Sequence, residues 1–231
     1  MPDHASQPSG YATVIFDLDG TLLDTLEDLH LTLNHSLAAL GLPERSFEET
    51  RAFVGNGIRR LVERAVPEGT DRSATDAVFD EFNRWYAGHC NVATHPYPGI
   101  VELVRALRAE GRHVAVVSNK SDYAVQSLVD VYFPGEFDAV AGVREGIAKK
   151  PARDMVDAAL AKMGEAAQAD AAAGRAAYVG DSEVDVQTAR NAEMPCISVT
   201  WGFRSVPQLR EAGATRLVAT ASELGAAIRE G

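Results

Sequence analysis

The stretch "VIFDLDGTLLDT", residues 14–25, joins a short apolar run to a group of acidic side chains. The β-branched and aromatic residues Val14, Ile15 and Phe16 are typical of a buried strand. Residues i and i+2 of an extended segment project to the same side, so we expect the carboxylates of Asp17 and Asp19 to lie together. The stretch therefore predicts a strand that ends in a pair of acidic groups.

Further apolar runs alternate with segments of helical period along the rest of the chain. In the helical segments apolar residues recur at i, i+3, i+4 and i+7, as in the segment that starts at Ile100. Strands and helices that alternate in this way favour right-handed crossovers and a parallel sheet covered on both faces. We therefore predict an α/β fold with a Rossmann-like, doubly wound sheet. Its expected strands are residues 13–16, 113–117, 139–141, 176–179, 197–200 and, at the edge, 217–219.

Residues 22–95 interrupt this alternation, because no strand of comparable quality occurs there. Leucines 26, 29, 33, 37 and 40 form one helical stripe, and residues 58–65 and 74–87 predict two further helices. Pro96 and Pro98 favour a rigid segment where the chain returns from the insertion, with a hinge over 97–99. We expect residues 1–21 and 96–231 to form the α/β core and residues 22–95 an inserted helical cap.

Asp24 lies where the chain leaves the core for this cap, and this position suits a helix-capping or hinge role. The Ala-rich stretch 165–177 is expected to be a helix end and a loop.

Composition excludes several classes of function. The net charge of −11 at pH 7 argues against nonspecific binding to nucleic acid or to an anionic membrane. No apolar run approaches the length of a membrane span, and residues 1–10 are expected to form a loose tail without a secretion signal. Cys90 and Cys196 fit no metal spacing and are expected to be free thiols of a reducing compartment. We expect a cytoplasmic protein, monomeric or homodimeric, with a small-molecule partner.

Polar residues follow four of the expected strands and should converge, because ligands of parallel sheets gather beyond the carboxyl ends of the strands. Like charges about 4 Å apart repel by about 4 kcal/mol at an effective dielectric near 20. Four gathered carboxylates therefore require a cation, and several oxygen ligands suit Mg²⁺. A carboxylate, Mg²⁺ and a lysine in one place suit phosphoryl transfer. Besides Asp17 and Asp19, the residues concerned are Ser118, Asn119, Lys120, Lys150, Asp181 and Asp185.

Each of these residues also has a purely structural interpretation. Asp-x-Asp-Gly is a common turn signal, and Ser118 could cap the helix that follows it. Lys150 could be a solvated surface residue, and Asp185 could merely complement a helix dipole. Four matches in order, each at the end of a separate strand, favour the chemical interpretation.

These residues also resemble the four motifs of the haloacid dehalogenase superfamily, from about residue 13 to 224. The matches are Asp17-x-Asp19-Gly20-Thr21, Ser118-Asn119, Lys150-Pro151 and Gly180-Asp181-Ser182-x-x-Asp185. The resemblance implies a sheet core with a helical cap inserted after the first strand.

The resemblance also implies a role for each site residue. Asp17 would be the nucleophile that forms an aspartyl-phosphate, and Asp19 would be general acid to the leaving oxygen and then general base to water. Mg²⁺ would be bound by the Asp17 side chain, the Asp19 main chain and Asp181, with Asp185 as their support. The phosphoryl group would be held by Gly20, Thr21, Ser118, Asn119 and Lys150.

Within the superfamily, the stretches "YPGIVELVRALRAEGRHVAVVSNK", "VGNGIRRLVERA" and "YVGDSEVDVQTARNA" look most like phosphoglycolate phosphatases. The resemblance places the loop 55–57, with Asn56 at its centre, in the cap and facing the site. Arg59 or Arg60 could meet a substrate carboxylate there. Alternatively both arginines lie on a solvated helix face, and Asn56 serves only the turn.

Asp19 argues against several alternative functions, and the cap of some seventy residues argues against a phosphorylation switch. A phosphonate-cleaving enzyme or a dehalogenase would lack the second acid, so both are excluded. A sugar-phosphate mutase, a pyrophosphatase and a nucleotidase of the same superfamily stay open. A receiver-like phosphorylation switch also uses an aspartate, Mg²⁺ and a lysine, but it needs a long-lived aspartyl-phosphate. Asp19 is placed to activate the water that destroys one. We therefore expect a Mg²⁺-dependent phosphatase that acts on 2-phosphoglycolate.

Overall fold

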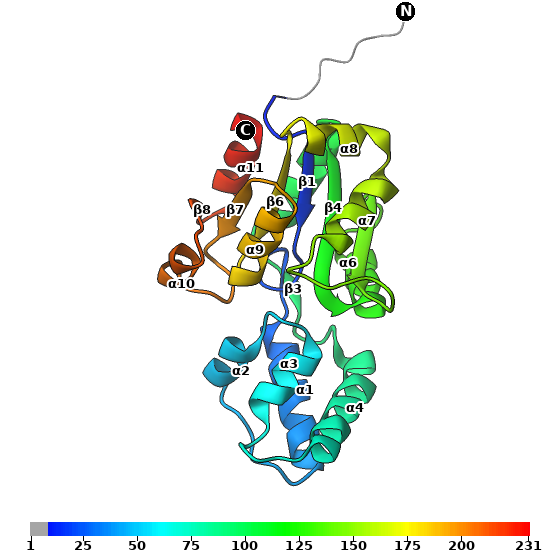
Figure 1. Ribbon diagram of the computed structural model, residues 1–231, viewed down its shortest axis with the longest axis vertical. Coiled ribbons are helices and arrows are strands. Elements are labelled where there is room, and N and C mark those ends of the chain that lie inside the picture. Colours follow the sequence, from blue (N-terminus) through cyan, green and yellow to red (C-terminus); the bar gives the residue numbers. More distant parts are fainter. Residues whose placement is uncertain (1–8) are drawn as a thin grey trace, which may run out of the picture.

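The computed structural model describes residues 9–231, and most of the expected tail, residues 1–8, lies outside them. Its centre is a parallel sheet in the order β5-β4-β1-β6-β7-β8 (Figure 1). All the predicted strands are present, with β8 at the edge. The strands are β1 (Thr13–Phe16), β4 (His113–Ser121), β5 (Ala139–Val143), β6 (Ala176–Gly180), β7 (Cys196–Val199) and β8 (Arg216–Val218).

Helices cover both faces of this sheet, as the alternating pattern predicts. On one face Val14 and Phe16 pack with apolar side chains of α5 (Ile100–Ala109), α6 (Asp122–Tyr132) and α11 (Ala221–Glu230). On the other face Ile15 packs with those of α7 (Asp154–Met163), α8 (Glu165–Ala172) and α9 (Glu183–Asn191). The short helix α10 (Val206–Glu211) packs on α9. The α/β fold class is therefore confirmed.

A separate group of four helices lies beyond one end of the sheet (Figure 1). It consists of α1 (Leu26–Ala39), α2 (Phe47–Phe53), α3 (Ile58–Ala65) and α4 (Arg72–His89). The group has its own apolar core, in which the leucine stripe of α1 packs against Phe82 and Tyr86 of α4. Leu40 does not belong to that core, because α1 ends before it and its side chain is exposed. Helix α2 was not expected from the sequence.

Two short strands join the helical group to the sheet, although no strand was expected between residues 22 and 95. Strands β2 (Leu23–Asp24) and β3 (His95–Pro96) pair antiparallel, so the two crossings of the chain lie side by side. The main-chain N–H of Tyr97 also donates to the carbonyl of Leu22. Asp24 accepts a hydrogen bond from the N–H of Leu26 at 3.2 Å, which fits its expected place at the start of a helix.

The Ala-rich stretch 165–177 differs from its predicted structure. Its first part forms the separate helix α8, which begins directly after Gly164, and its last two residues belong to β6. Ala167 is buried against the sheet. Alanine fits this position because a small side chain allows the helix to approach the sheet closely, and its high helix propensity favours α8.

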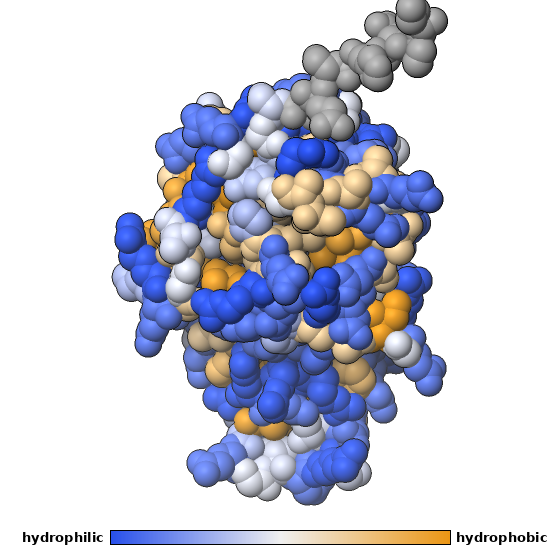
Figure 2. Space-filling model, turned by 45° about the horizontal axis from the view of Figure 1, so that its top comes forward, coloured by the Kyte–Doolittle hydropathy of each residue, from blue (hydrophilic) through white to orange (hydrophobic). Residues whose placement is uncertain are grey.

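Hydrophilic residues predominate on the face drawn in Figure 2, and hydrophobic ones occur there in small groups. Within residues 9–231, no helix combines the length and the apolar character needed to cross a membrane. Cys90 and Cys196 are both free, as predicted. Burial raises the pKa of the Cys196 thiol to about 12, and nearby Asp185 adds to this shift. Cys196 is therefore an unreactive thiol at neutral pH.

Candidate active site

Asp17 is the first residue after β1 and is buried at the carboxyl end of the sheet. One of its carboxylate oxygens accepts a hydrogen bond from the N–H of Leu18 and lies 2.9 Å from Nζ of Lys150. Burial raises the pKa of Asp17 to about 7, with Lys150 opposing the shift and neighbouring carboxylates adding to it. This carboxylate therefore needs positive charge beside it to stay ionised at neutral pH.

Asp181 follows β6, the strand next to β1, and its carboxylate lies close to that of Asp17. It accepts hydrogen bonds from the hydroxyl of Thr21 at 3.3 Å and from the N–H of Phe203 at 2.7 Å. Burial raises the pKa of Asp181 well above its usual value, and Asp185 and Asp17 add to the shift. The two strand ends thus bring two acidic groups together, as the spacing of the motifs predicts.

Asp17, Asp181 and Asp185 each offer a carboxylate oxygen, and these oxygens lie within 4.8 Å of one another. All three residues are buried, so water screens their mutual repulsion only weakly. Hard oxygen donors in this number are the ligands of a divalent cation such as Mg²⁺. The donor set, together with the raised pKa values of Asp17 and Asp181, therefore fits a metal ion beside these carboxylates.

Asp185 and Lys150 form an ion pair inside the protein. The Lys150 ammonium donates to Asp185 at 2.9 Å and to the hydroxyl of Tyr178 at 3.0 Å. Burial alone would lower the pKa of Lys150, but Asp17 and Asp185 hold it well above its usual value. The second oxygen of Asp185 accepts from the main chain and hydroxyl of Ser182. Lys150 is therefore a fixed, charged group directed at Asp17 and is not a solvated surface residue.

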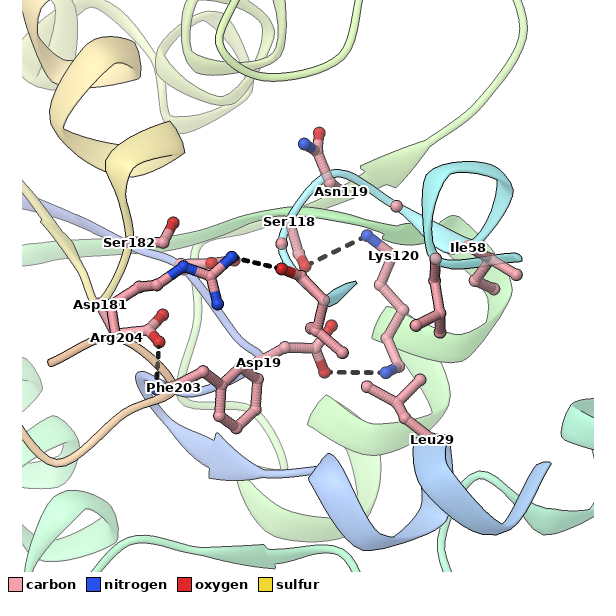
Figure 3. A pocket seen from close by; sticks show the side chains of 15 residues that line it. Asp19, Leu29, Ile58, Ser118, Asn119, Lys120, Asp181, Ser182, Phe203 and Arg204 are labelled. Carbon is pink, nitrogen blue, oxygen red and sulfur yellow. Dashed lines mark hydrogen bonds and ion pairs between the residues drawn. The ribbon is translucent and has the colours of Figure 1, made fainter. Parts of the chain in front are cut away.

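Asp19 lines the same pocket as Asp17 but is not part of the acidic group formed by Asp17, Asp181 and Asp185. Its carboxylate accepts a hydrogen bond from the hydroxyl of Thr25 at 2.7 Å. It accepts another from the ammonium of Lys120 at 2.8 Å (Figure 3). Lys120 is buried, and its Nζ lies 4.9 Å from the centre of the Tyr86 ring on α4. Burial alone would lower the pKa of Lys120, but Asp19 and Tyr86 raise it above its usual value. Lys120 follows Ser118 and Asn119, so it was expected at this edge of the sheet, but the four motifs give it no role.

Ser118 and Asn119 belong to β4, which continues four residues past its predicted end. Ser118 does not cap α6, because the N-cap residue is Ser121. Its hydroxyl instead accepts a hydrogen bond from the N–H of Lys120 at 3.3 Å. The Asn119 side-chain amide donates to the carbonyl of Lys150 at 3.0 Å, which joins two of the predicted motifs.

A pocket lies between the sheet and the helical group, with several site residues in its lining (Figure 3). On the sheet side it is lined by Asp17, Asp19, Ser118, Asn119, Lys120, Asp181, Ser182, Phe203 and Arg204. On the helical side it is lined by Leu29, Val54, Gly55, Gly57, Ile58 and Leu61. A Cβ atom on Gly57 would lie 3.2 Å from the carbonyl oxygen of Asn119, so this loop closely approaches the sheet side. The loop 55–57 therefore faces the site, as predicted.

Gly20 and Thr21 are close to the site but are not part of the pocket lining. The N–H of Gly20 donates to the carbonyl of Leu23, and the hydroxyl of Thr21 is directed at Asp181. A Cβ atom on Gly20 would lie 2.4 Å from a carboxylate oxygen of Asp181. Both residues thus shape the surroundings of Asp181, and direct contact with phosphate stays a prediction.

The described structure does not bring Arg59, Arg60 or the Asn56 side chain to the pocket lining. Arg59 pairs with Asp76 at 2.5 Å and lies over a phenyl ring of α4. Arg60 pairs with Glu63 at 2.7 Å on the exposed side of α3. These contacts fit the alternative of a solvated helix face, and a substrate contact from Asn56, Arg59 or Arg60 stays a prediction.

Arg204 is a further residue that the motifs did not reveal. It is buried, pairs with Glu183 at 2.8 Å and donates to the carbonyls of Arg51 and Val54 in the helical group. It therefore connects the loop after β7 to the loop that covers the pocket. It follows a strand end, like the predicted residues, and that position is the signal that could have indicated it.

Comparisons with known proteins agree with this geometry. A family model described as haloacid dehalogenase-like hydrolase matches residues 14–199. The phosphoglycolate phosphatase of Agrobacterium fabrum is 34% identical over 203 residues, which cover 84% of this chain and 83% of that protein. The phosphoglycolate phosphatase of Caulobacter vibrioides is 36% identical over 200 residues, covering 85% and 82%.

Solved structures are also similar to this chain over almost its whole length. A crystal structure from Lactobacillus delbrueckii subsp. bulgaricus, of a protein assigned as a phosphoglycolate phosphatase, superposes with a TM-score of 0.85. Its identity is 38%, and the match covers 95% of this chain and 98% of that one. CbbY from Rhodobacter sphaeroides, solved in complex with phosphate, gives a TM-score of 0.72 at 26% identity, covering 94% and 99%.

The family match begins within β1 and ends with β7, so it includes the strand ends that carry the acidic group and both site lysines. The relatives from two organisms are phosphatases that align with more than four-fifths of this chain. This chain therefore belongs to the haloacid dehalogenase-like hydrolase family and is a phosphatase of that family.

Proposed function

We propose that this phosphatase hydrolyses 2-phosphoglycolate to glycolate and phosphate with the aid of Mg²⁺, in the cytoplasm. The observation that carries the proposal is the pocket in which Asp17, Asp19 and Asp181 lie under a loop of the helical group. Relatives named phosphoglycolate phosphatase, 34% and 36% identical to this chain, support the choice of substrate.

In the proposed reaction Asp17 supplies the nucleophile. A carboxylate oxygen of Asp17 forms a bond to phosphorus while the bond from phosphorus to the ester oxygen breaks. The departing glycolate oxygen takes a proton from Asp19. A water molecule then attacks the aspartyl-phosphate and gives its proton to Asp19, which releases phosphate and restores Asp17. Asp17 and Asp19 stand two residues apart at one strand end, which suits this division of roles.

The metal site in this proposal uses the two carboxylates of Asp17 and Asp181, whose pKa values burial raises. Asp17, Asp181 and the main chain of Asp19 would hold Mg²⁺, which supplies positive charge to a phosphoryl group that carboxylates would otherwise repel. Lys150 adds a second positive charge beside Asp17. Asp185 acts on the reaction through Lys150, which it holds at 2.9 Å.

The lining of the pocket supports a small substrate. On the helical side it consists of glycines 55 and 57 and of aliphatic side chains such as Ile58 and Leu61. These groups exclude water and offer few hydrogen bonds to a sugar or a base. Closure of the helical group over a bound ester, with a hinge at residues 97–99, would leave only the attacking water in the site.

A panel of phosphate esters tests the proposed substrate. The purified protein would be assayed with Mg²⁺ for phosphate release from 2-phosphoglycolate, sugar phosphates, nucleotides and pyrophosphate. We expect 2-phosphoglycolate to give the highest kcat/KM. A higher value for a nucleotide or for pyrophosphate would refute the choice of substrate. Isomerised sugar phosphate without net phosphate release would instead identify a mutase.

A further inference from the structure

Lys120 is a buried cation in the pocket lining that the proposed reaction does not use. Its Nζ lies 2.8 Å from a carboxylate oxygen of Asp19, and that same oxygen also accepts a hydrogen bond from Thr25. The aliphatic part of the side chain is enclosed, since only 3% of the residue is exposed. An ammonium group has three donors, of which Asp19 engages one. The position is therefore a fixed positive charge beside the proposed acid and base.

The Tyr86 ring of the helical group lies against this charge. The ring centre lies 4.9 Å from Nζ, and Tyr86 is fully buried in α4. A cation over an aromatic face is attracted by the ring quadrupole, more strongly when it is desolvated. Lys120 thus comes from the sheet, and its ammonium contacts both Asp19 and, in the helical group, Tyr86.

The other positive charges near the site are already engaged, including the exposed Lys149, whose ammonium donates to the carbonyl of Asn56. Among the described residues in the pocket lining, Arg204 is the other cation, and it binds Glu183 and two main-chain carbonyls. Lys150 binds Asp17 and Asp185. Arg59 and Arg60 pair with acidic residues outside the pocket lining. Lys120 is therefore the cation best placed to meet a second anionic group on a substrate.

We propose that Lys120 determines specificity by binding the carboxylate of the leaving group, so that the enzyme prefers phosphate esters with an anionic group next to the ester carbon. This proposal rests on the proposed function, in which Asp19 protonates the ester oxygen. In 2-phosphoglycolate the carboxylate is attached to the carbon that bears that oxygen. It must therefore lie close to Asp19, where the Lys120 ammonium already is.

A competing role must be separated from this one. Lys120 could serve only to position Asp19, in which case its loss would slow the hydrolysis of every ester by a similar factor. Binding of the carboxylate adds a loss that only the anionic ester suffers. The ratio of kcat/KM for two esters that differ only in this charge therefore distinguishes the roles.

The experiment compares 2-phosphoglycolate with 2-hydroxyethyl phosphate, which carries a neutral hydroxymethyl group in place of the carboxylate. Lys120→Gln removes the charge and keeps a hydrogen-bond donor for Asp19, while Lys120→Arg keeps the charge. Lys120→Met is a second uncharged variant, and circular dichroism identifies the variants that fold. Lys162→Met is the matched control, because Lys162 is exposed in the last turn of α7 and does not belong to the pocket lining.

We expect wild type and Lys162→Met to prefer 2-phosphoglycolate. In a folded uncharged variant that preference should fall by about 10- to 100-fold, the effect of one charge-assisted hydrogen bond, and Lys120→Arg should keep most of it. An unchanged preference in Lys120→Gln or Lys120→Met would overturn the proposal while leaving the substrate assignment intact. A wild type that shows no preference for the anionic ester would overturn both.

Discussion

Lys150 and Asp185 form an ion pair that is closed to solvent, with Nζ and a carboxylate oxygen 2.9 Å apart and side chains 1% and 0% exposed. Because Asp185 also accepts two hydrogen bonds from Ser182, its position is fixed by the start of α9. The start of α9 therefore fixes, through Asp185, the position of the Lys150 ammonium beside Asp17.

The first prediction concerns this pair. Asp185→Asn keeps the shape of the side chain but removes the charge that holds Lys150, so kcat for 2-phosphoglycolate should fall about 10- to 100-fold. Steady-state kinetics with saturating Mg²⁺ would measure the loss. Asp157→Asn is the control, because Asp157 pairs with Arg153 on the exposed side of α7. Equal kcat values for Asp185→Asn and the wild type would contradict the role assigned to the pair.

The second prediction concerns pH and metal removal. The pKa of Asp17 is about 7 in the folded, metal-free protein, above its ordinary value of 3.8. The folded state therefore holds this proton more tightly than the unfolded chain. The resulting stabilisation is present below about pH 4 and is lost as pH rises towards 7.

Urea unfolding in EDTA at pH 5 and pH 7.5 would measure this effect. The free energy of unfolding of the wild type, relative to Asp17→Asn, should fall between the two pH values by on the order of 2 kcal/mol. Mg²⁺ should reduce the fall, because a bound cation favours the ionised carboxylate. A relative stability that rises with pH in EDTA would show that the burial of Asp17 has been misjudged.

The third prediction concerns Gly20. Its φ of +81° is unfavourable for any residue with a Cβ atom, and that atom would meet the Asp181 carboxylate. Gly20→Ala should therefore displace Asp181 and raise the Mg²⁺ concentration for half-maximal activity by about 10-fold or more. Gly41→Ala is a matched control, since Gly41 has a φ of +68° and open space around its Cβ position. Identical Mg²⁺ requirements in the two variants would contradict the prediction.

The fourth prediction concerns Arg204, which connects the loop after β7 to α2 and the loop that follows it. Arg204→Met would leave the carbonyl of Val54 without its donor, which costs about 1–3 kcal/mol in the free energy of unfolding. The pocket loop should also lose its position, so kcat/KM should fall about 10-fold. Chemical denaturation and kinetics would be compared with those of Arg210→Met, a change on the exposed side of α10. A fall in stability without a fall in kcat/KM would limit Arg204 to a structural role.

Much of the fold could be predicted because apolar runs and helical periods are local features of the sequence. The six strands of the sheet followed from short apolar runs, and the acidic group followed from the rule that polar residues after parallel strands converge. The pairing of β2 with β3 could not be predicted, since two-residue strands leave no periodic pattern.

The residues that were missed depend on contacts between distant parts of the chain. The sequence predicts Tyr178 only as a core residue of β6, but its hydroxyl accepts a hydrogen bond from Lys150. Lys120 was expected at this edge of the sheet, but its contacts depend on the length of β4 and on Tyr86 from α4 and could not be predicted. The direction of the Arg59 side chain depends on its contact with Asp76, 17 residues further along the chain. The helical period of α3 does not reveal that contact.

The central claim is that Asp17 is the nucleophile of a phosphatase. The most direct test is phosphate release from 2-phosphoglycolate by Asp17→Asn at saturating Mg²⁺, with Asp24→Asn as a control from the same segment. Asp24 accepts a hydrogen bond at the start of α1, and asparagine can accept it too. We predict that Asp17→Asn folds but loses more than about 10³-fold in kcat, while Asp24→Asn stays active. Substantial turnover by folded Asp17→Asn would contradict the account.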